Sequence, residues 1–188
     1  PQRSSLSNNG AGNGHRFPGA RTECADLPWP DCASMIGAEP NWIFWHHWPD
    51  SRVHDLSVAG QGLETLSKEA AQTLLSDQFW DFVERLATGR RLIITSDHGY
   101  AAPGLFADAP EEQAKFLRDT FKGGRSASGD GETGPWVPPI ALSLTSRRGD
   151  YRLALGRRKW KSQGGYPTLA HGGLSILEVL SPFVELTK

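Results

Sequence analysis

The segment "RLIITSDHGYAAPG", Arg91–Gly104, constrains the fold of this chain more than any other stretch. Ile93, Ile94 and Thr95 favour β-structure and lead directly into Asp97-His98-Gly99. A carboxylate at the end of a buried strand is costly unless something neutralises it. Ligands of α/β proteins bind at the carboxyl ends of parallel strands, so this segment predicts a strand whose end carries a functional site.

A second strand is predicted at "NWIFWHH", Asn41–His47, because its composition favours β-structure. Residues 61–88 then repeat apolar positions at helical spacing, which predicts one amphipathic helix, with a break near Ser76-Asp77 as the alternative and with Gly89 placed as a helix C-cap. Strand, helix and strand at this spacing predict a βαβ unit. We therefore expect an α/β fold with a mostly parallel sheet flanked by helices.

The remainder of the chain gives shorter signals. Proline in a first turn favours a helix at Pro110–Phe121, and the composition of Lys122–Pro135 is typical of a mobile loop. Residues 140–156 predict a β-hairpin that turns around Arg148-Gly149-Asp150. A short helix is expected after Gly173, and an edge strand after Pro182.

The N-terminal part contrasts with the rest. Residues 1–20 are rich in Ser, Asn and Gly and predict a flexible arm, and residues 21–40 contain three prolines and predict irregular structure. The domain organisation expected from the sequence is thus a flexible or irregular segment at 1–40 and a folded α/β portion at 41–188.

Composition limits the class of protein. A chain of 188 residues, 38% hydrophobic and 22% charged, suits one medium globular domain. Its net charge of −1 argues against a binder that attaches to nucleic acid or membrane through overall charge. No apolar run approaches the roughly 20 residues that span a bilayer. We expect no membrane partner and a cytoplasmic location.

Cys24 and Cys32 leave alternatives open. They are close enough in sequence for a disulfide that closes a short loop, and two reduced thiols explain them equally well. A zinc site formed with His15 is a further alternative, although the usual spacing of paired zinc-binding cysteines is absent.

Candidate metal ligands follow both predicted strands. "HHWPDSRVHD" after the earlier strand contains Asp50 and His54 in the spacing D-x-x-x-H, and His171 lies in "LAHGGLS", where glycines allow close backbone approach. Carboxylate and imidazole ligands suit Zn²⁺ and related ions. A bound cation would also neutralise Asp97 and give His98 a partner.

Each of these residues also has a simpler interpretation. Asp97-His98-Gly99 fits an ordinary turn, and His171 fits the start of a helix. His46 and His47 are better explained as hydrogen-bonded histidines at the edge of the core than as ligands.

Taken together, these pieces resemble the alkaline phosphatase superfamily, and within it most closely the PglZ domain. The matching segments are "IFWHHWPDSRVH", the amphipathic helix, "LIITSDHGY" and "YPTLAHGGLSILEVLSPFVEL". The last is the most specific, because it combines His-Gly-Gly, a short helix with a Glu, and a proline before the closing strand. The resemblance covers residues 41–188 and implies that the chain is the C-terminal half of an alkaline-phosphatase-like domain.

The resemblance implies two divalent metal ions, Zn²⁺ or alternatively Mn²⁺. Asp50, His54 and His171 would hold one ion, and Asp97 and His98 the other. The family also uses a nucleophilic Thr or Ser and one more Asp, both from an N-terminal half with its own strand. The sequence predicts no strand before residue 41, and Ser4, Ser5 and Ser7 lie in the flexible arm. No nucleophile is therefore assigned.

The implied function is a metal-dependent phosphatase or phosphodiesterase connected with bacterial phage defence of the BREX type. Its expected partners are a phosphate-ester or nucleotide substrate, nucleic acid, the N-terminal half and other defence proteins. The alternatives are a non-catalytic metal-binding scaffold module and a related sulfatase or phosphomutase-type enzyme.

A cluster of cations near the hairpin suggests one contact surface. Tyr151 and Trp160 are interleaved with Arg147, Arg148, Arg152, Arg157, Arg158, Lys159 and Lys161. Arg157, Arg158 and Lys159 are the candidate contacts for phosphate or nucleic acid. A solvated hairpin and loop is the alternative explanation.

Overall fold

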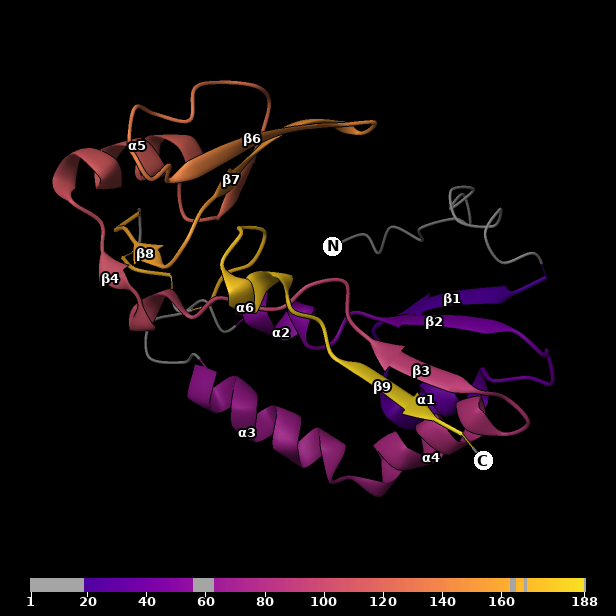
Figure 1. Ribbon diagram of the computed structural model, residues 1–188. Helices are drawn as coiled ribbons and strands as arrows, with labels where there is room; N and C mark the ends of the chain where they lie inside the picture. The colour runs from indigo at the N-terminus through magenta and orange to yellow at the C-terminus, as the bar shows by residue number, and fades with distance from the viewer. Residues whose placement is uncertain (1–18, 56–62, 163–164, 168, 188) are drawn as a thin grey trace, which may run out of the picture. The chain divides into compact units, whose positions relative to one another are not determined.

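The computed structural model describes residues 19–55, 63–162, 165–167 and 169–187, with the backbone alone at 53–55 (Figure 1). The chain forms two compact units, each assembled from segments that are distant in sequence. The first unit comprises Pro1–Trp48, Leu75–Leu92 and Leu186–Lys188, and the second comprises Pro49–Leu74 and Ile93–Glu185. None of the boundaries between the units lies at residue 40, where the sequence analysis divides the chain.

The first unit is built on a small parallel sheet. Strand β1 (Arg21–Ala25) pairs in parallel with β2 (Trp42–His46), in a register that places Arg21 opposite Trp42. Helix α1 (Trp29–Ser34) connects the two strands, and prolines at its N-cap and in its first turn suit the start of a helix. The expectation of irregular structure at 21–40, with no strand before residue 41, is therefore wrong.

Aromatic packing stabilises the first unit. Helix α4 (Asp77–Ala87) buries Phe79, Phe82, Val83, Leu86 and Ala87. The Trp29 ring lies 5.1 Å from the Phe79 ring, and the Phe44 ring lies 4.9 Å from the Phe82 ring. The side chain of Ser76 caps α4 by accepting a hydrogen bond from the Phe79 N–H, and Gly89 follows the helix with φ +70°. The single helix expected over residues 61–88 is instead two helices, and the division falls at the alternative break near Ser76-Asp77, because α3 (Leu63–Leu74) ends before it.

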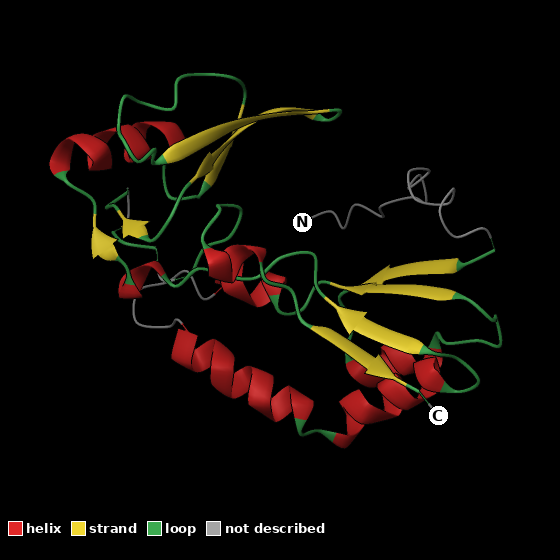
Figure 2. Ribbon diagram, in the orientation of Figure 1, coloured by secondary structure: helices red, strands yellow, loops and turns green. Residues whose placement is uncertain are grey.

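The second unit contains three small sheets (Figure 2). Strand β3 (Leu92–Thr95) pairs with β9 (Phe183–Leu186). Most of both strands belongs to the second unit, and only the end residues Leu92 and Leu186 are assigned to the first. Strand β4 (Ala107–Asp108) pairs in parallel with β8 (Arg158–Lys159). The antiparallel order β5-β7-β6 joins Ser126–Ser128, Gly149–Ala154 and Ala141–Ser146. The helical segments are α2 (Asp50–Asp55), α3, η1 (Pro103–Leu105), α5 (Glu111–Phe121) and α6 (Ile176–Val179).

The largest core cluster of the second unit joins α5 to the hairpin. Leu117 and Phe121 from α5 pack with Ile140, Ala141, Ala154 and Trp160. The indole N–H of Trp160 donates to the Lys122 carbonyl oxygen at 2.8 Å, which satisfies the one polar group of this buried ring. The hairpin, α5 and α6 lie where the sequence predicts them.

Three other expectations do not hold. Strand β5 lies inside the segment predicted as a loop, Lys122–Pro135. Strand β3 is not fully buried, since Ile93 is 43% exposed. The predicted parallel pairing of β2 with β3 is not among the described sheets, because β2 pairs with β1 and β3 with β9. No large parallel sheet is present in the described part, so the alkaline-phosphatase-like fold stays a prediction.

No helix in the described ranges combines the length and the apolar character that a bilayer-spanning helix needs.

The α5 cluster gives a test of the core. We expect Leu117→Ala to lower the free energy of unfolding by about 2–5 kcal/mol, because Leu117 is 1% exposed and its removal leaves a cavity. Leu105→Ala is the control, since Leu105 is 70% exposed and its loss should change stability by less than about 0.5 kcal/mol. Urea denaturation measures both variants, and equal effects would contradict this description of the core.

Candidate metal centre

Asp50 is the first residue of α2, which is attached to α3 by a two-bond ion pair. The Arg52 guanidinium donates to the Glu69 carboxylate through Nε at 3.0 Å and through Nη2 at 2.9 Å. This geometry restrains Arg52 more than a single-bond contact would. Asp50, two residues before Arg52, is therefore presented from a helix whose position α3 fixes.

His98 follows β3, and the next residue must be glycine. A Cβ atom on Gly99 would collide with the backbone carbonyl oxygens of Leu177 and Leu180. The close approach allows the Gly99 N–H to donate to the Glu178 carbonyl oxygen at 2.9 Å. The segment after β3 is thus tied to α6.

The His98 ring is oriented as a ligand would be. Its Nδ1 lies 3.0 Å from the Gly99 carbonyl oxygen, which can only accept a hydrogen bond. The proton of the neutral ring therefore belongs on Nδ1, which leaves the Nε2 lone pair available for a metal ion. A backbone carbonyl that fixes the tautomer in this way is typical of metal-binding histidines.

His171 is brought to His98 by backbone pairing. Ala101 and Ala170 exchange two N–H to carbonyl hydrogen bonds, of 2.8 and 3.0 Å. The rings of His98 and His171 consequently stack, with centroids 4.5 Å apart and planes inclined by 6°. Nε2 of His171 lies 3.5 Å from Oδ1 of Asp50.

One ligand atom from each of Asp50, His98 and His171 lies within 4.8 Å of the others. The side chains are 39%, 25% and 31% exposed, so the cluster is partly shielded and still open to solvent. One carboxylate and two imidazoles are a ligand set of catalytic zinc sites, which keep a further position free. The residues present therefore fit a divalent ion, and all three lie in the second unit.

The grouping of the ligands differs from the expectation. His98 was expected with Asp97 at a separate metal, yet it lies with Asp50 and His171 because the Ala101–Ala170 pairing joins their two segments. Asp97 lies beside this cluster, with Oδ1 3.7 Å from Nε2 of His98. His54 belongs to α2, and its side chain lies outside the described residues.

Asp97 is not buried, so the expectation that a cation neutralises a buried carboxylate there is wrong. The Asp97 side chain is 53% exposed, so its charge needs no neutralising partner to be tolerated there. A cation at Asp97 would therefore serve the function of the site, because the solvation of this carboxylate does not require one.

Tyr100 is a site residue that sequence reasoning missed. Its hydroxyl donates to Oδ1 of Asp50 at 3.4 Å, and its ring meets the His98 ring edge-on at 5.3 Å. Burial, followed by the charge of Asp50, raises the pKa of Tyr100 well above its usual range. The phenol therefore remains a hydrogen-bond donor to the carboxylate. Its one sequence signal is its place directly after Asp97-His98-Gly99.

The cysteines and the histidines of β2 form no comparable centre in the described part of the chain. Cys24 and Cys32 are both free thiols, and His15 lies outside the described residues. Cys24 Sγ lies 3.2 Å from Nε2 of His47. His46 accepts from the Trp48 N–H at Nδ1 and lies 2.9 Å from the Leu27 carbonyl at Nε2, as expected of a hydrogen-bonded histidine.

The basic segment is partly used within the fold. The Arg157 guanidinium lies 5.4 Å from the centroid of the Phe106 ring, and the Lys159 ammonium lies 5.1 Å from that of Tyr166. Trp160 is 5% exposed, so it offers no face on which a base could stack. A contact of Arg157, Arg158 and Lys159 with phosphate or nucleic acid stays a prediction.

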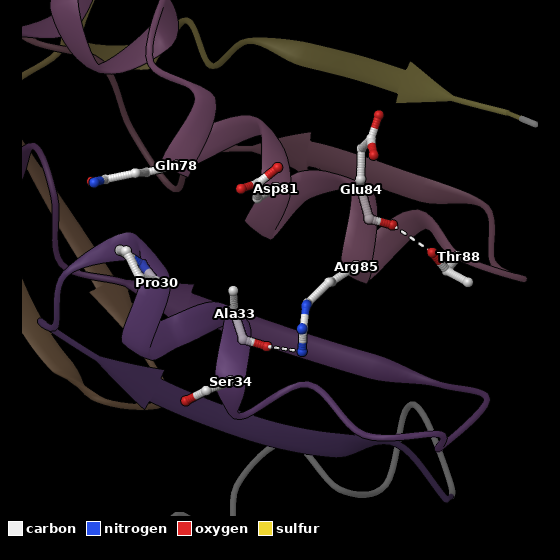
Figure 3. Close-up of a pocket in the computed structure, with 8 residues that line it drawn as sticks. All are labelled: Pro30, Ala33, Ser34, Gln78, Asp81, Glu84, Arg85 and Thr88. Atoms are coloured by element: carbon white, nitrogen blue, oxygen red, sulfur yellow. Dashed lines mark hydrogen bonds between the residues drawn. The ribbon is translucent and has the colours of Figure 1, made fainter.

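A separate hollow of about 480 Å³ lies in the first unit, between α1 and α4 (Figure 3). Its lining is Pro30, Ala33, Ser34, Gln78, Asp81, Glu84, Arg85 and Thr88. Arg85 donates to the Ala33 carbonyl oxygen at 3.3 Å, and the Thr88 hydroxyl donates to that of Glu84 at 2.8 Å. The hollow contains no histidine or cysteine and shares no residue with the cluster of Asp50, His98 and His171.

Comparison with protein-family models, with curated proteins and with solved structures finds no match to this chain.

The two thiols should differ in reactivity. In the native chain we expect Cys24 to react readily with a disulfide reagent such as DTNB, because it is exposed. Cys32 is 0% exposed and burial raises the pKa of its thiol, so it should react only on unfolding. Cys24→Ser should remove the fast phase alone. Loss of both thiols in the unfolded, unreduced chain would instead indicate a disulfide.

Proposed function

We propose that this chain carries the divalent-metal centre of a phosphoric ester hydrolase of the PglZ type, within the alkaline phosphatase superfamily. The observation that carries the proposal is the convergence of Asp50, His98 and His171, from three separate segments, on one volume. All three are among the candidate ligands that the sequence indicates. Polar residues from unrelated turns have no reason to meet in this way.

The residues of the centre have complementary roles in the proposed site. His98 and His171 offer imidazole nitrogens, and Asp50 supplies the negative charge that offsets that of the cation. The Tyr100 hydroxyl donates to Oδ1 of Asp50 and so restrains the orientation of this carboxylate. Bound Zn²⁺ or Mn²⁺ would act as a Lewis acid and lower the pKa of a coordinated hydroxyl or water.

The proposal includes a second metal ion, because the resemblance to the alkaline phosphatase superfamily implies two. Oδ1 of Asp97 lies 3.7 Å from Nε2 of His98, and this carboxylate is exposed enough to turn toward a second cation. The nucleophilic Thr or Ser remains unassigned.

A non-catalytic metal-binding scaffold is the second candidate, favoured by the unassigned nucleophile. A sulfatase or phosphomutase-type enzyme would use similar ligands, so the cluster alone does not separate these activities. Phosphate esters or nucleotides are the proposed substrates. Nucleic acid, an N-terminal half and other phage-defence proteins are the proposed partners.

Metal binding tests the centre directly. We expect the metal-free chain to bind Zn²⁺ and Mn²⁺, and Asp50→Asn or His171→Gln to weaken the affinity at least about tenfold, because each removes one of three ligands. His47→Gln is the matched control, since His47 lies in the first unit beside Cys24. Isothermal titration calorimetry measures all four chains. Unchanged affinity in both ligand variants would reject the centre.

Turnover separates the two candidate functions. The metal-loaded chain is assayed with a chromogenic phosphodiester, and His98→Gln is compared with the unaltered protein. Hydrolysis that requires both the metal and His98 supports the hydrolase. Tight metal binding without hydrolysis supports the scaffold module.

A further inference from the structure

A fully buried ion pair lies in the second unit. Nε of Arg125 donates to Oε1 of Glu178 at 2.7 Å, and the two side chains are 2% and 1% exposed. Burying such a pair gives little net stability, because the loss of hydration offsets the attraction between the charges. A buried apolar pair would fill the same space at a lower desolvation cost. The pair therefore calls for an explanation other than packing.

The carboxylate of Glu178 also holds the segment that follows His171. Oε1 accepts from the Gly173 N–H, and Oε2 accepts from the Ser175 N–H, both at 2.9 Å. A Cβ atom on Gly173 would lie only 2.8 Å from both Arg125 Nε and Glu178 Oε1, so the backbone reaches the ion pair only because this residue is glycine. His171 is two residues away from this anchor.

The backbone of Glu178 holds the other histidine segment. Its carbonyl oxygen accepts from the Gly99 N–H at 2.9 Å, and Gly99 directly follows His98. One residue thus contacts both of the segments that present an imidazole to the candidate metal centre. Its side chain acts on the His171 segment and its main chain on the His98 segment.

Arg125 fixes the carboxylate in turn. Nη2 donates to the Gly156 carbonyl oxygen at 2.7 Å, and Nη1 donates to that of Arg158 at 3.3 Å. The guanidinium also lies 5.6 Å from the centroid of the Trp160 ring, which belongs to the core cluster of α5. The Arg125 side chain that binds the Glu178 carboxylate is therefore itself held by two backbone carbonyl oxygens and by its contact with the Trp160 ring.

We propose that Glu178, held by Arg125, is a positioning residue that sets the distance between His98 and His171 for metal binding. Only a carboxylate can accept from Arg125, Gly173 and Ser175 at the same time, which explains an acid at this buried position. This inference rests on the proposed metal centre, since it assigns Glu178 a role in that centre. Residues that orient metal ligands typically contribute 10–100-fold to affinity.

The test measures Co²⁺ affinity and the visible Co²⁺ absorption spectrum, which reports ligand geometry independently of turnover. Glu178→Gln replaces one acceptor oxygen by a donor that faces a backbone N–H or Arg125. We expect its Co²⁺ affinity to fall about 10–100-fold, with a shifted spectrum. Leu117→Ala is the matched control, because it destabilises the core of the same unit without removing a bond to either histidine segment. It should keep the affinity and spectrum of the unaltered chain while folded.

Glu178→Gln leaves the buried charge of Arg125 without its partner, and a second variant controls for this effect. Arg125→Met combined with Glu178→Gln removes both charges and keeps one acceptor, and it should show the same loss of affinity. Unaltered Co²⁺ binding by either folded Glu178 variant overturns the inference, and so does an equal loss in Leu117→Ala. Failure of the unaltered chain to bind Co²⁺ would instead overturn the metal centre itself.

Discussion

The pairing of Ala101 with Ala170 is the interaction on which the candidate centre depends. Two backbone hydrogen bonds join segments that are far apart in sequence, and each segment carries a histidine next to or near its paired alanine. Both alanines are buried, so an unmade bond here would leave polar groups without water. The contact therefore fixes His98 beside His171 through the main chain. The contact of Gly99 with Glu178 extends the same arrangement to α6.

The sequence predicted those elements whose local pattern is strong. The helical spacing within residues 61–88, the proline start of α5 and the β-hairpin within residues 140–156 agree with the structure, although the helical segment is divided into α3 and α4. Strand β1 was missed because "RTECA" places polar and charged residues on both faces, and because prolines follow it. Sheet pairing was missed for a different reason. Which strand pairs with which depends on contacts distant in sequence, and periodicity contains no information about them.

The residues of the candidate site also fall into those that the sequence predicted and those that it did not. Residue type selected Asp50 and His98 together with their position after a predicted strand, and His171 together with its neighbouring glycines. Their grouping follows from tertiary pairing and differs from the grouping that the resemblance implies. Tyr100 has no motif of its own. Glu178 did have a signal, because "SILE" at 175–178 matches the Ser-x-x-Glu pattern of a helix start, although that pattern predicts a cap and not a buried ion pair. Such supporting residues are recognised only once their partners are known.

The charge of Asp97 matters for the substrate of the proposed site, and not for the stability of a buried strand end as the sequence suggested. A divalent cation held by one carboxylate keeps a net positive charge, which attracts an anionic phosphate ester. The exposed carboxylate of Asp97, 3.7 Å from the ring of His98, opposes that attraction. A second cation at Asp97 removes the repulsion and adds a positive charge for the phosphate oxygens. In the proposed hydrolase, therefore, the second ion is required by the charge of the substrate and not by burial of the protein's own carboxylate.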